Sequence, residues 1–265
     1  ATASGNVRRN SLMDFVNVQS NGKIAMKLEE GDKLINVEMC DDNSDVMLAA
    51  KSGKCNRFAV ADCRVFVGRN SSGVRGIKLA DGDEVISMSI LKHVKASTDD
   101  RDEYLRLASA LKKAEYQESE EENVFNSLEP KIGYDVFKEM RENEEFILTV
   151  TVTGYGKRTS AYEYRITARG GQGVANMEMS ERNKEVISSF PIKDDGQIMM
   201  VTDGGKLIRM PVEDIRIAGR KTQGVILFRT AEGESVVSVT PLDVDDEDDD
   251  TDEIVEEFTD VAVEE

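Results

Sequence analysis

The 265-residue sequence predicts an all-β fold, a propeller-like array of small antiparallel sheets that is interrupted by one helical insertion. Three observations point to this fold. A strand–turn–strand pattern recurs along the chain, and glycines stand at fixed offsets within each copy. The first two copies are 48 residues apart and the last two are 51 residues apart. Units of roughly 40–50 residues that are rich in short strands are typical of propeller blades, so we expect about four blades.

The last copy shows the repeating unit most clearly. Residues 198–202 predict a strand, Asp203-Gly204-Gly205 predicts a tight turn, and residues 206–210 predict the returning strand. The same hairpin is expected at 46–58 and 147–159, and in truncated form at 1–9.

The offsets within the copies are regular. Each copy has a turn glycine, followed four residues later by an arginine and 17–20 residues later by a second glycine. A glycine at a fixed offset indicates a turn that needs positive φ or a close backbone approach in every copy. The turn glycines are Gly5, Gly53, Gly154 and Gly205, and the second glycines are Gly22, Gly73, Gly173 and Gly224.

One stretch departs from the repeat. The second and third turn glycines are 101 residues apart, and the excess lies in the segment 96–145. Tyr104, Leu107 and Leu111 fall on one face of a predicted helix. A disordered acidic loop is the alternative, because apolar residues are few. Further short helices are expected around the pairs Val124 with Leu128 and Tyr134 with Phe137.

Charge divides the chain into four parts. We expect two blades at 1–95, an acidic helical insertion at 96–145, two further blades at 146–242 and a disordered acidic tail at 243–265. The tail has 14 acidic residues and no basic one, and the insertion has 15 acidic and 7 basic residues. The blades alone have 27 basic and 23 acidic residues, a net charge of +4, although the whole chain carries −18. A mildly basic body is compatible with nucleic-acid binding.

The sequence lacks the residues that several classes of function require. No apolar run reaches the ~18–20 residues of a membrane helix, and no signal peptide opens the chain. Three cysteines without CxxC spacing and one histidine do not make a usual zinc site, so we expect no metal and a reducing, cytoplasmic setting. The lone histidine also argues against a Ser/His/Asp or Cys/His catalytic set. We therefore expect a non-catalytic chain without cofactors.

Three segments carry a family resemblance. Residues 68–76 and 219–227 contain Gly-Arg-x3-Gly-Val, and residues 154–159 contain Gly-x3-Arg. This combination resembles the C-terminal domain of the DNA gyrase A subunit, and the resemblance covers 1–95 and 146–242.

The resemblance implies a β-pinwheel, a propeller relative whose four-stranded blades exchange strands. It implies that duplex DNA is bound and bent around the outer edge, which lets the gyrase holoenzyme introduce negative supercoils at the expense of ATP. The implied partners are duplex DNA and, in a heterotetramer, the gyrase B subunit together with the N-terminal domains of the A subunit. The implied setting is the bacterial cytoplasm, near the nucleoid and away from membranes, and no cofactor is implied.

Two departures qualify the resemblance. The hallmark box Gln-Arg-Arg-Gly-Gly-Lys-Gly is absent, and residues 167–173 are its degenerate counterpart. The family's pinwheel has six blades, whereas this chain has four copies and starts without Met. We therefore expect a fragment that is truncated on its N-terminal side and begins at about the third blade.

Two sets of basic residues are candidate DNA contacts. One is the arginine after each turn glycine, which repetition would place at one height around the rim, and the other lies in the loops before the second glycine. Arginine suits phosphate because its planar fork donates two hydrogen bonds and keeps its charge. The alternative for the first set is that these arginines are ordinary solvent-facing residues of an outer strand. The alternative for the second set is that the loops are structural turns whose arginines pair with acids of the next blade. The sets are Arg9, Arg57, Arg158 and Arg209, and Arg69, Arg169, Arg220 and Lys221.

Three questions stay open at this point. Within the family, the C-terminal domain of the topoisomerase IV A subunit has similar blades. Outside it, a propeller-like protein-interaction scaffold would dock partners on the insertion and would not bind DNA. The acidic tail either competes with DNA for the basic rim or is a solvated terminus.

Overall fold

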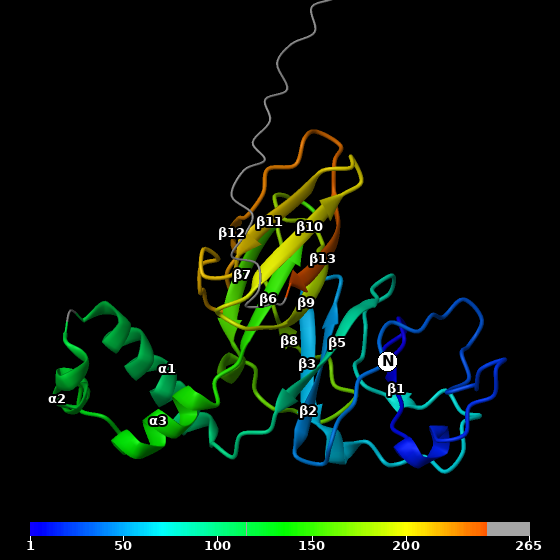
Figure 1. Cartoon of the computed structure of the whole chain (residues 1–265), viewed down its shortest axis with the longest axis horizontal. Coiled ribbons are helices and arrows are strands. Elements are labelled where there is room, and N and C mark those ends of the chain that lie inside the picture. The colour runs from blue at the N-terminus through cyan, green and yellow to red at the C-terminus, as the bar shows by residue number, and fades with distance from the viewer. Residues whose placement is uncertain (115, 243–265) are drawn as a thin grey trace, which may run out of the picture.

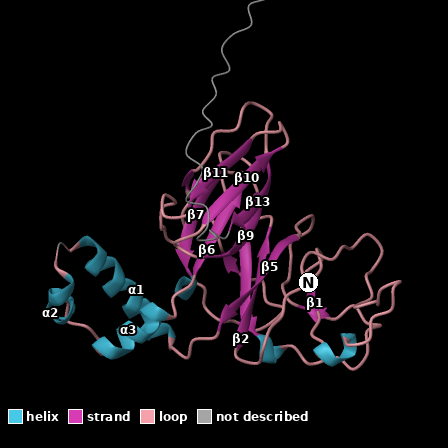
Figure 2. Ribbon diagram, in the orientation of Figure 1, coloured by secondary structure: helices cyan, strands magenta, loops and turns pink. Residues whose placement is uncertain are grey.

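A computed structural model describes residues 1–114 and 116–242, so the tail predicted at 243–265 lies outside the described residues. Small antiparallel sheets follow one another along the chain, and a helical lobe stands beside them (Figures 1 and 2). The strands are β1 (Asn6–Val7), β2 (Ser44–Ala50), β3 (Lys54–Ala59), β4 (Val74–Arg75), β5 (Val85–Lys92), β6 (Phe146–Thr151), β7 (Tyr155–Ser160), β8 (Val174–Ala175), β9 (Val186–Ile192), β10 (Gln197–Thr202), β11 (Leu207–Pro211), β12 (Val225–Ile226) and β13 (Val236–Leu242).

The sheets are the predicted blades. Two of them are complete and four-stranded, with the orders β5-β2-β3-β8 and β9-β6-β7-β12. The fourth repeat forms the three-stranded sheet β13-β10-β11, and the first repeat contributes to the two-stranded sheet β1-β4. The prediction of an all-β pinwheel of antiparallel blades is confirmed. The expectation of four strands in every blade is wrong for the first and the last.

Strand exchange explains these differences. The outermost strand of each complete blade comes from the following repeat, since β8 pairs with β3 and β12 pairs with β7. β4 pairs with β1 in the same way. Within the described residues no later repeat supplies an outer strand to β11. Within residues 1–43, all of which the structure describes, β1 is the one strand.

Two of the repeated glycines allow this exchange to be tight. Gly154 has φ +77°, and a Cβ at this position would lie 2.2 Å from the carbonyl oxygen of Phe228, in the following repeat. Gly73 has φ +88°, and its Cβ would lie 2.3 Å from the carbonyl oxygen of Val7 in the preceding repeat. The fixed glycines therefore mark points where neighbouring repeats touch backbone to backbone.

The cores lie between blades. Met47 and Leu91 of the second repeat pack with Ile147 and Tyr164 of the third, and all four side chains are buried. The inner strands β5, β9 and β13 contact one another in sequence. The inner strands therefore form the centre of the array, and the exchanged strands form its outer edge.

The insertion is helical, as its apolar spacing predicts. It contains α1 (Thr98–Lys113), α2 (Glu121–Ser127) and α3 (Tyr134–Glu142), and a capping box of Ser97 with Asp100 starts α1. Tyr104, Phe125 and Phe137 form its buried core.

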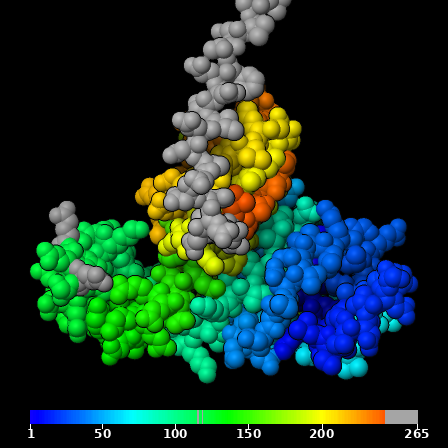
Figure 3. Space-filling view, in the orientation of Figure 1, coloured from blue at the N-terminus to red at the C-terminus, as the bar shows by residue number. Residues whose placement is uncertain are grey.

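The helical lobe is fastened to the third blade. Tyr162, in the 3-10 turn η4 (Ala161–Glu163), belongs to the lobe's core, and its hydroxyl donates to the carbonyl oxygen of Met140 at 2.8 Å. Figure 3 shows the lobe projecting beside the blades. Every helix within 1–114 and 116–242 is too short or too polar to cross a membrane.

Candidate nucleic-acid interface

The outer edge of the array is built by three glycine loops. Each loop, at 68–73, 169–173 or 219–224, directly precedes an exchanged strand, and these strands are β4, β8 and β12. Because the exchanged strand is outermost in its sheet, the loop before it lies on the outer edge. The predicted loop residues therefore lie on the outer edge of the array.

The turn-proximal arginines do not form one exposed ring. Arg57 and Arg158 are only 2% and 6% exposed. Arg57 forms a 2.8 Å ion pair with the buried Asp45, and it donates to the carbonyl oxygen of Ala161 at 2.7 Å. The expectation that these side chains lie on a solvent-exposed rim is therefore wrong.

The following repeat causes this burial. Arg158 pairs through its backbone with Ile217, and its guanidinium donates to the carbonyl oxygens of Ile215 and Glu213. Arg57 pairs in the same way with Ile166. A buried guanidinium needs partners for its donors, and the next repeat provides some of them, at Ala161 for Arg57 and at Ile215 and Glu213 for Arg158. These two arginines fasten consecutive repeats together.

The other two members of the set are more open. Arg9 is partly exposed, forms an ion pair with Asp42 and bridges to Val65 of the next repeat. Arg209 is exposed and donates to Gln197 on the neighbouring strand β10. Arg209 thus keeps its charged group at the surface.

The loop arginines make one repeated contact. Each donates to the carbonyl oxygen two residues past the second glycine of the preceding repeat, rather than to an acid. They remain partly exposed, and Lys221 is exposed. The pairs are Arg69 with Ile24, Arg169 with Arg75 and Arg220 with Ala175.

A second group of polar residues shapes the loops from beneath. The Lys157 ammonium donates to the carbonyl oxygens of Gly219, Arg220 and Thr222 at 2.8, 2.7 and 3.2 Å. Burial lowers the pKa of Lys157 to about 8. Arg8 donates in the same manner to the carbonyl oxygen of Ser71 at 2.6 Å. These loops are therefore built around a cation from the preceding repeat.

Sequence reasoning missed a third set of arginines. Eleven residues after three of the turn glycines stand Arg64, Arg165 and Arg216, and all three are exposed. Each immediately precedes the residue that pairs with a turn-proximal arginine, so the backbone pairing holds it at the edge. The offset comparison that found the other sets would have found this one too.

Metal-ligating and thiol side chains were the other candidates for chemistry in the described part of the chain. None of its His, Cys, Asp and Glu side chains gather in threes that could hold a metal ion. Cys55 is buried, and burial raises the pKa of its thiol to about 12, so it is not a reactive thiolate.

Comparison with known families matches the repeats individually. The model described as "DNA gyrase C-terminal domain, beta-propeller" matches residues 1–41, 44–92, 145–193 and 196–243. The four matched segments correspond to the four repeats.

Curated relatives are similar over almost the whole chain. The DNA gyrase A subunit of Granulibacter bethesdensis is 48% identical over 96% of this chain, which spans 29% of that protein. The DNA gyrase A subunit of Rickettsia bellii is 48% identical over 97% of this chain, which spans 28% of that protein. The chain thus spans less than a third of the length of these relatives.

Two solved structures share the fold. The C-terminal domain of DNA topoisomerase IV matches with a TM-score of 0.67 and 18% identity, covering 91% of this chain and 60% of that one. The DNA gyrase A C-terminal domain matches with a TM-score of 0.64 and 21% identity, covering 91% of this chain and 64% of that one.

Proposed function

Since this chain belongs to the DNA gyrase C-terminal domain, beta-propeller family, we propose that it binds duplex DNA along the outer edge of its blades and bends it. The module itself is non-catalytic. In the complete enzyme it presents wrapped DNA for ATP-dependent negative supercoiling. Its partners there are the N-terminal domains of the A subunit and the gyrase B subunit. It acts in the bacterial cytoplasm, at the nucleoid.

One observation carries this proposal, namely that basic side chains recur at matching positions along the outer edge. In each of the last three repeats an exposed arginine stands four or five residues before the partly exposed loop arginine, and these exposed residues are Arg64, Arg165 and Arg216. A regular series of positive charges on a curved edge suits the regular series of phosphates on a bent duplex.

This arrangement favours DNA shape over base sequence. Phosphate contacts position a duplex without reading its bases, and deformable sequences bend at lower cost. Smooth bending of a 20–30 bp site costs on the order of 1–6 kcal/mol, so several contacts along the edge must offset it. We propose that Arg57 and Arg158 hold neighbouring blades together, whereas the loop and edge residues contact DNA phosphates.

The alternatives are separated by different observations. The relatives at 48% identity are gyrase subunits, which favours gyrase over topoisomerase IV, since the topoisomerase IV structure at 18% identity shares the fold alone. The protein-interaction scaffold predicts no affinity for DNA.

Binding and bending of an end-labelled duplex of about 40 base pairs test the proposal. We expect fluorescence anisotropy to report binding and energy transfer between the two ends to rise on binding. The variant Arg64→Ala/Arg165→Ala/Arg216→Ala should lose most of both signals. A matched control, Lys112→Ala/Lys113→Ala/Lys131→Ala, removes the same charge from exposed residues of the insertion and should retain them. Absence of binding by the unmodified chain would refute the proposal.

A further inference from the structure

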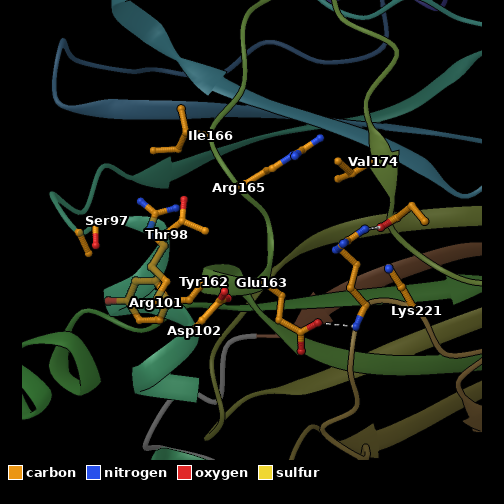
Figure 4. A pocket seen from close by; sticks show the side chains of 13 residues that line it. Ser97, Thr98, Arg101, Asp102, Tyr162, Glu163, Arg165, Ile166, Val174 and Lys221 are labelled. Atoms are coloured by element: carbon orange, nitrogen blue, oxygen red, sulfur yellow. Dashed lines mark hydrogen bonds between the residues drawn. The ribbon is translucent and has the colours of Figure 1, made fainter. Parts of the chain in front are cut away.

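A cavity of about 680 Å³ separates the helical lobe from the outer edge. Its walls come from the start of α1, from η4, from the segment around β8 and from the glycine loop at 219–224 (Figure 4). The cavity is thus lined jointly by the insertion and by a loop assigned to DNA.

Positive charge predominates among its lining residues. Four basic side chains line it, against the two acids Asp102 and Glu163. Glu163 accepts a hydrogen bond from the backbone N–H of Arg220 at 2.6 Å. Within the described residues none of the four basic side chains forms an ion pair. The four are Arg101, Arg165, Arg220 and Lys221.

Two of these side chains have a buried donor without an acceptor. Over 1–114 and 116–242, the buried side-chain polar atoms that lack a hydrogen-bond partner are the Nε atoms of Arg101 and Arg220. Arg101 is 5% exposed, and its remaining contact is a 2.9 Å hydrogen bond from Nη2 to the carbonyl oxygen of Val94. Buried donors are almost always paired in folded proteins, and these two unpaired ones belong to two side chains that line the same cavity.

We propose that this cavity binds a backbone phosphate of duplex DNA, so that the insertion extends the DNA-binding edge. The inference rests on the proposed function and deepens it. A phosphodiester supplies the negative charge that the four basic lining residues lack, and the planar guanidinium matches its geometry.

The position of the cavity favours the duplex over a free anion. Arg165 belongs both to the cavity wall and to the exposed edge series, and Lys221 is exposed beside it. A strand that follows the edge from Arg64 to Arg216 therefore passes Arg165 at the cavity. Arg101 reaches the same space from α1, as Figure 4 shows.

A charge placed inside the cavity tests this proposal. Thr98 is exposed at the first position of α1 and lines the cavity, and an acid there is compatible with the helix N-terminus. Thr98→Glu should weaken duplex affinity several-fold without lowering the unfolding temperature. Ser109→Glu, an exposed position roughly 16 Å along the same helix, adds the same charge and should leave affinity unchanged. Equal weakening by both variants, or none by either, would overturn the proposal.

A second variant removes the insertion's own contact. Arg101→Gln should lower the slope of log K against log salt by about 0.9, the value for one phosphate contact. Thr98→Glu keeps the test decisive if Arg101→Gln does not fold.

Calorimetric titration with inorganic phosphate distinguishes a backbone phosphate of DNA from a free phosphate anion as the ligand of the cavity. If Arg101→Gln abolishes phosphate binding while duplex affinity stays unchanged, the cavity takes a free anion and the proposal is wrong. Failure of the unmodified chain to bind DNA would instead refute the proposed function itself, and this inference with it.

Discussion

The third and fourth blades are built from the same sequence unit and differ at the same two positions. In the third blade, Gly154 is pressed against the backbone of Phe228 and Arg158 is buried. In the fourth, a Cβ on Gly205 would meet nothing within 4 Å, and Arg209 is exposed. The third blade is covered by the strand β12 of the next repeat, whereas β11 has no such cover among the described residues.

This difference shows that the role of a repeated residue is set by its neighbour. The unit specifies a turn and an arginine on the returning strand, and the following repeat then decides whether that arginine is a buried fastener or a surface charge. The same variants made in both blades therefore have unequal effects.

The largest contrast is expected for the arginines. Arg158→Ala leaves the carbonyl oxygens of Ile215 and Glu213 without their donor, so we expect a loss of about 2–4 kcal/mol in the free energy of unfolding. Arg209→Ala, at the exposed counterpart, should change it by less than about 0.5 kcal/mol. Urea unfolding of both variants measures this, and equal losses would show that the repeats are not fastened by Arg158.

The turn glycines should differ next. Gly154→Ala introduces a Cβ 2.2 Å from a backbone oxygen and should cost more than about 2 kcal/mol. Gly205→Ala meets open space and carries only the strain of φ +81°, about 1 kcal/mol. Urea unfolding measures this difference as well. An equal loss in the free energy of unfolding for the Gly205 and Gly154 variants would contradict the role of strand exchange.

Lys157 adds a pH dependence to the third blade, where the fourth has Ile208 at the same offset. Burial lowers the pKa of Lys157 from 10.5 to about 8 in the folded chain. Between these values the unfolded chain binds more protons than the folded chain, so stability rises with pH. Relative to Lys157→Met, the unmodified chain should gain on the order of 1–3 kcal/mol from pH 7 to 10.5. A pH-independent difference would show that the ammonium is not desolvated.

The smallest effect expected is that of the acidic tail. A chain that ends at Leu242 lacks 14 acidic residues and should bind duplex DNA a few-fold more tightly at low salt. The gain should disappear as salt rises, because screening removes the competition. An unchanged affinity at low salt would show that the tail does not compete with DNA.

The sequence predicts the fold well because its repeated turns are local. Glycine offsets and short apolar runs place β6, β7, β10 and β11 to within a residue or two, and the apolar face of Tyr104, Leu107 and Leu111 predicts α1. The missing fourth strand of the last blade could not be predicted this way, because that strand would come from another repeat.

The candidate interface is predicted less completely. Arg158 and Arg209 stand at identical offsets, and burial separates them only once neighbouring repeats are in place. From the sequence, Lys157 would be expected at the surface because it is a lysine on a predicted strand. In the structure it is fully buried beneath a loop that lies 62 residues farther along the chain. Arg64, Arg165 and Arg216 were within reach of the offset comparison, whereas the cavity at Arg101 arises only from the packing of the insertion.

We propose that the exposed edge arginines, rather than the buried ones, hold the duplex. To test this, the slope of log K against log salt is measured for the unmodified chain and for Arg64→Ala/Arg165→Ala/Arg216→Ala. We predict a steep negative slope that becomes shallower by about 0.9 for each removed phosphate contact, close to 3 in all. The same slope in both proteins, with unfolding behaviour intact, would contradict it.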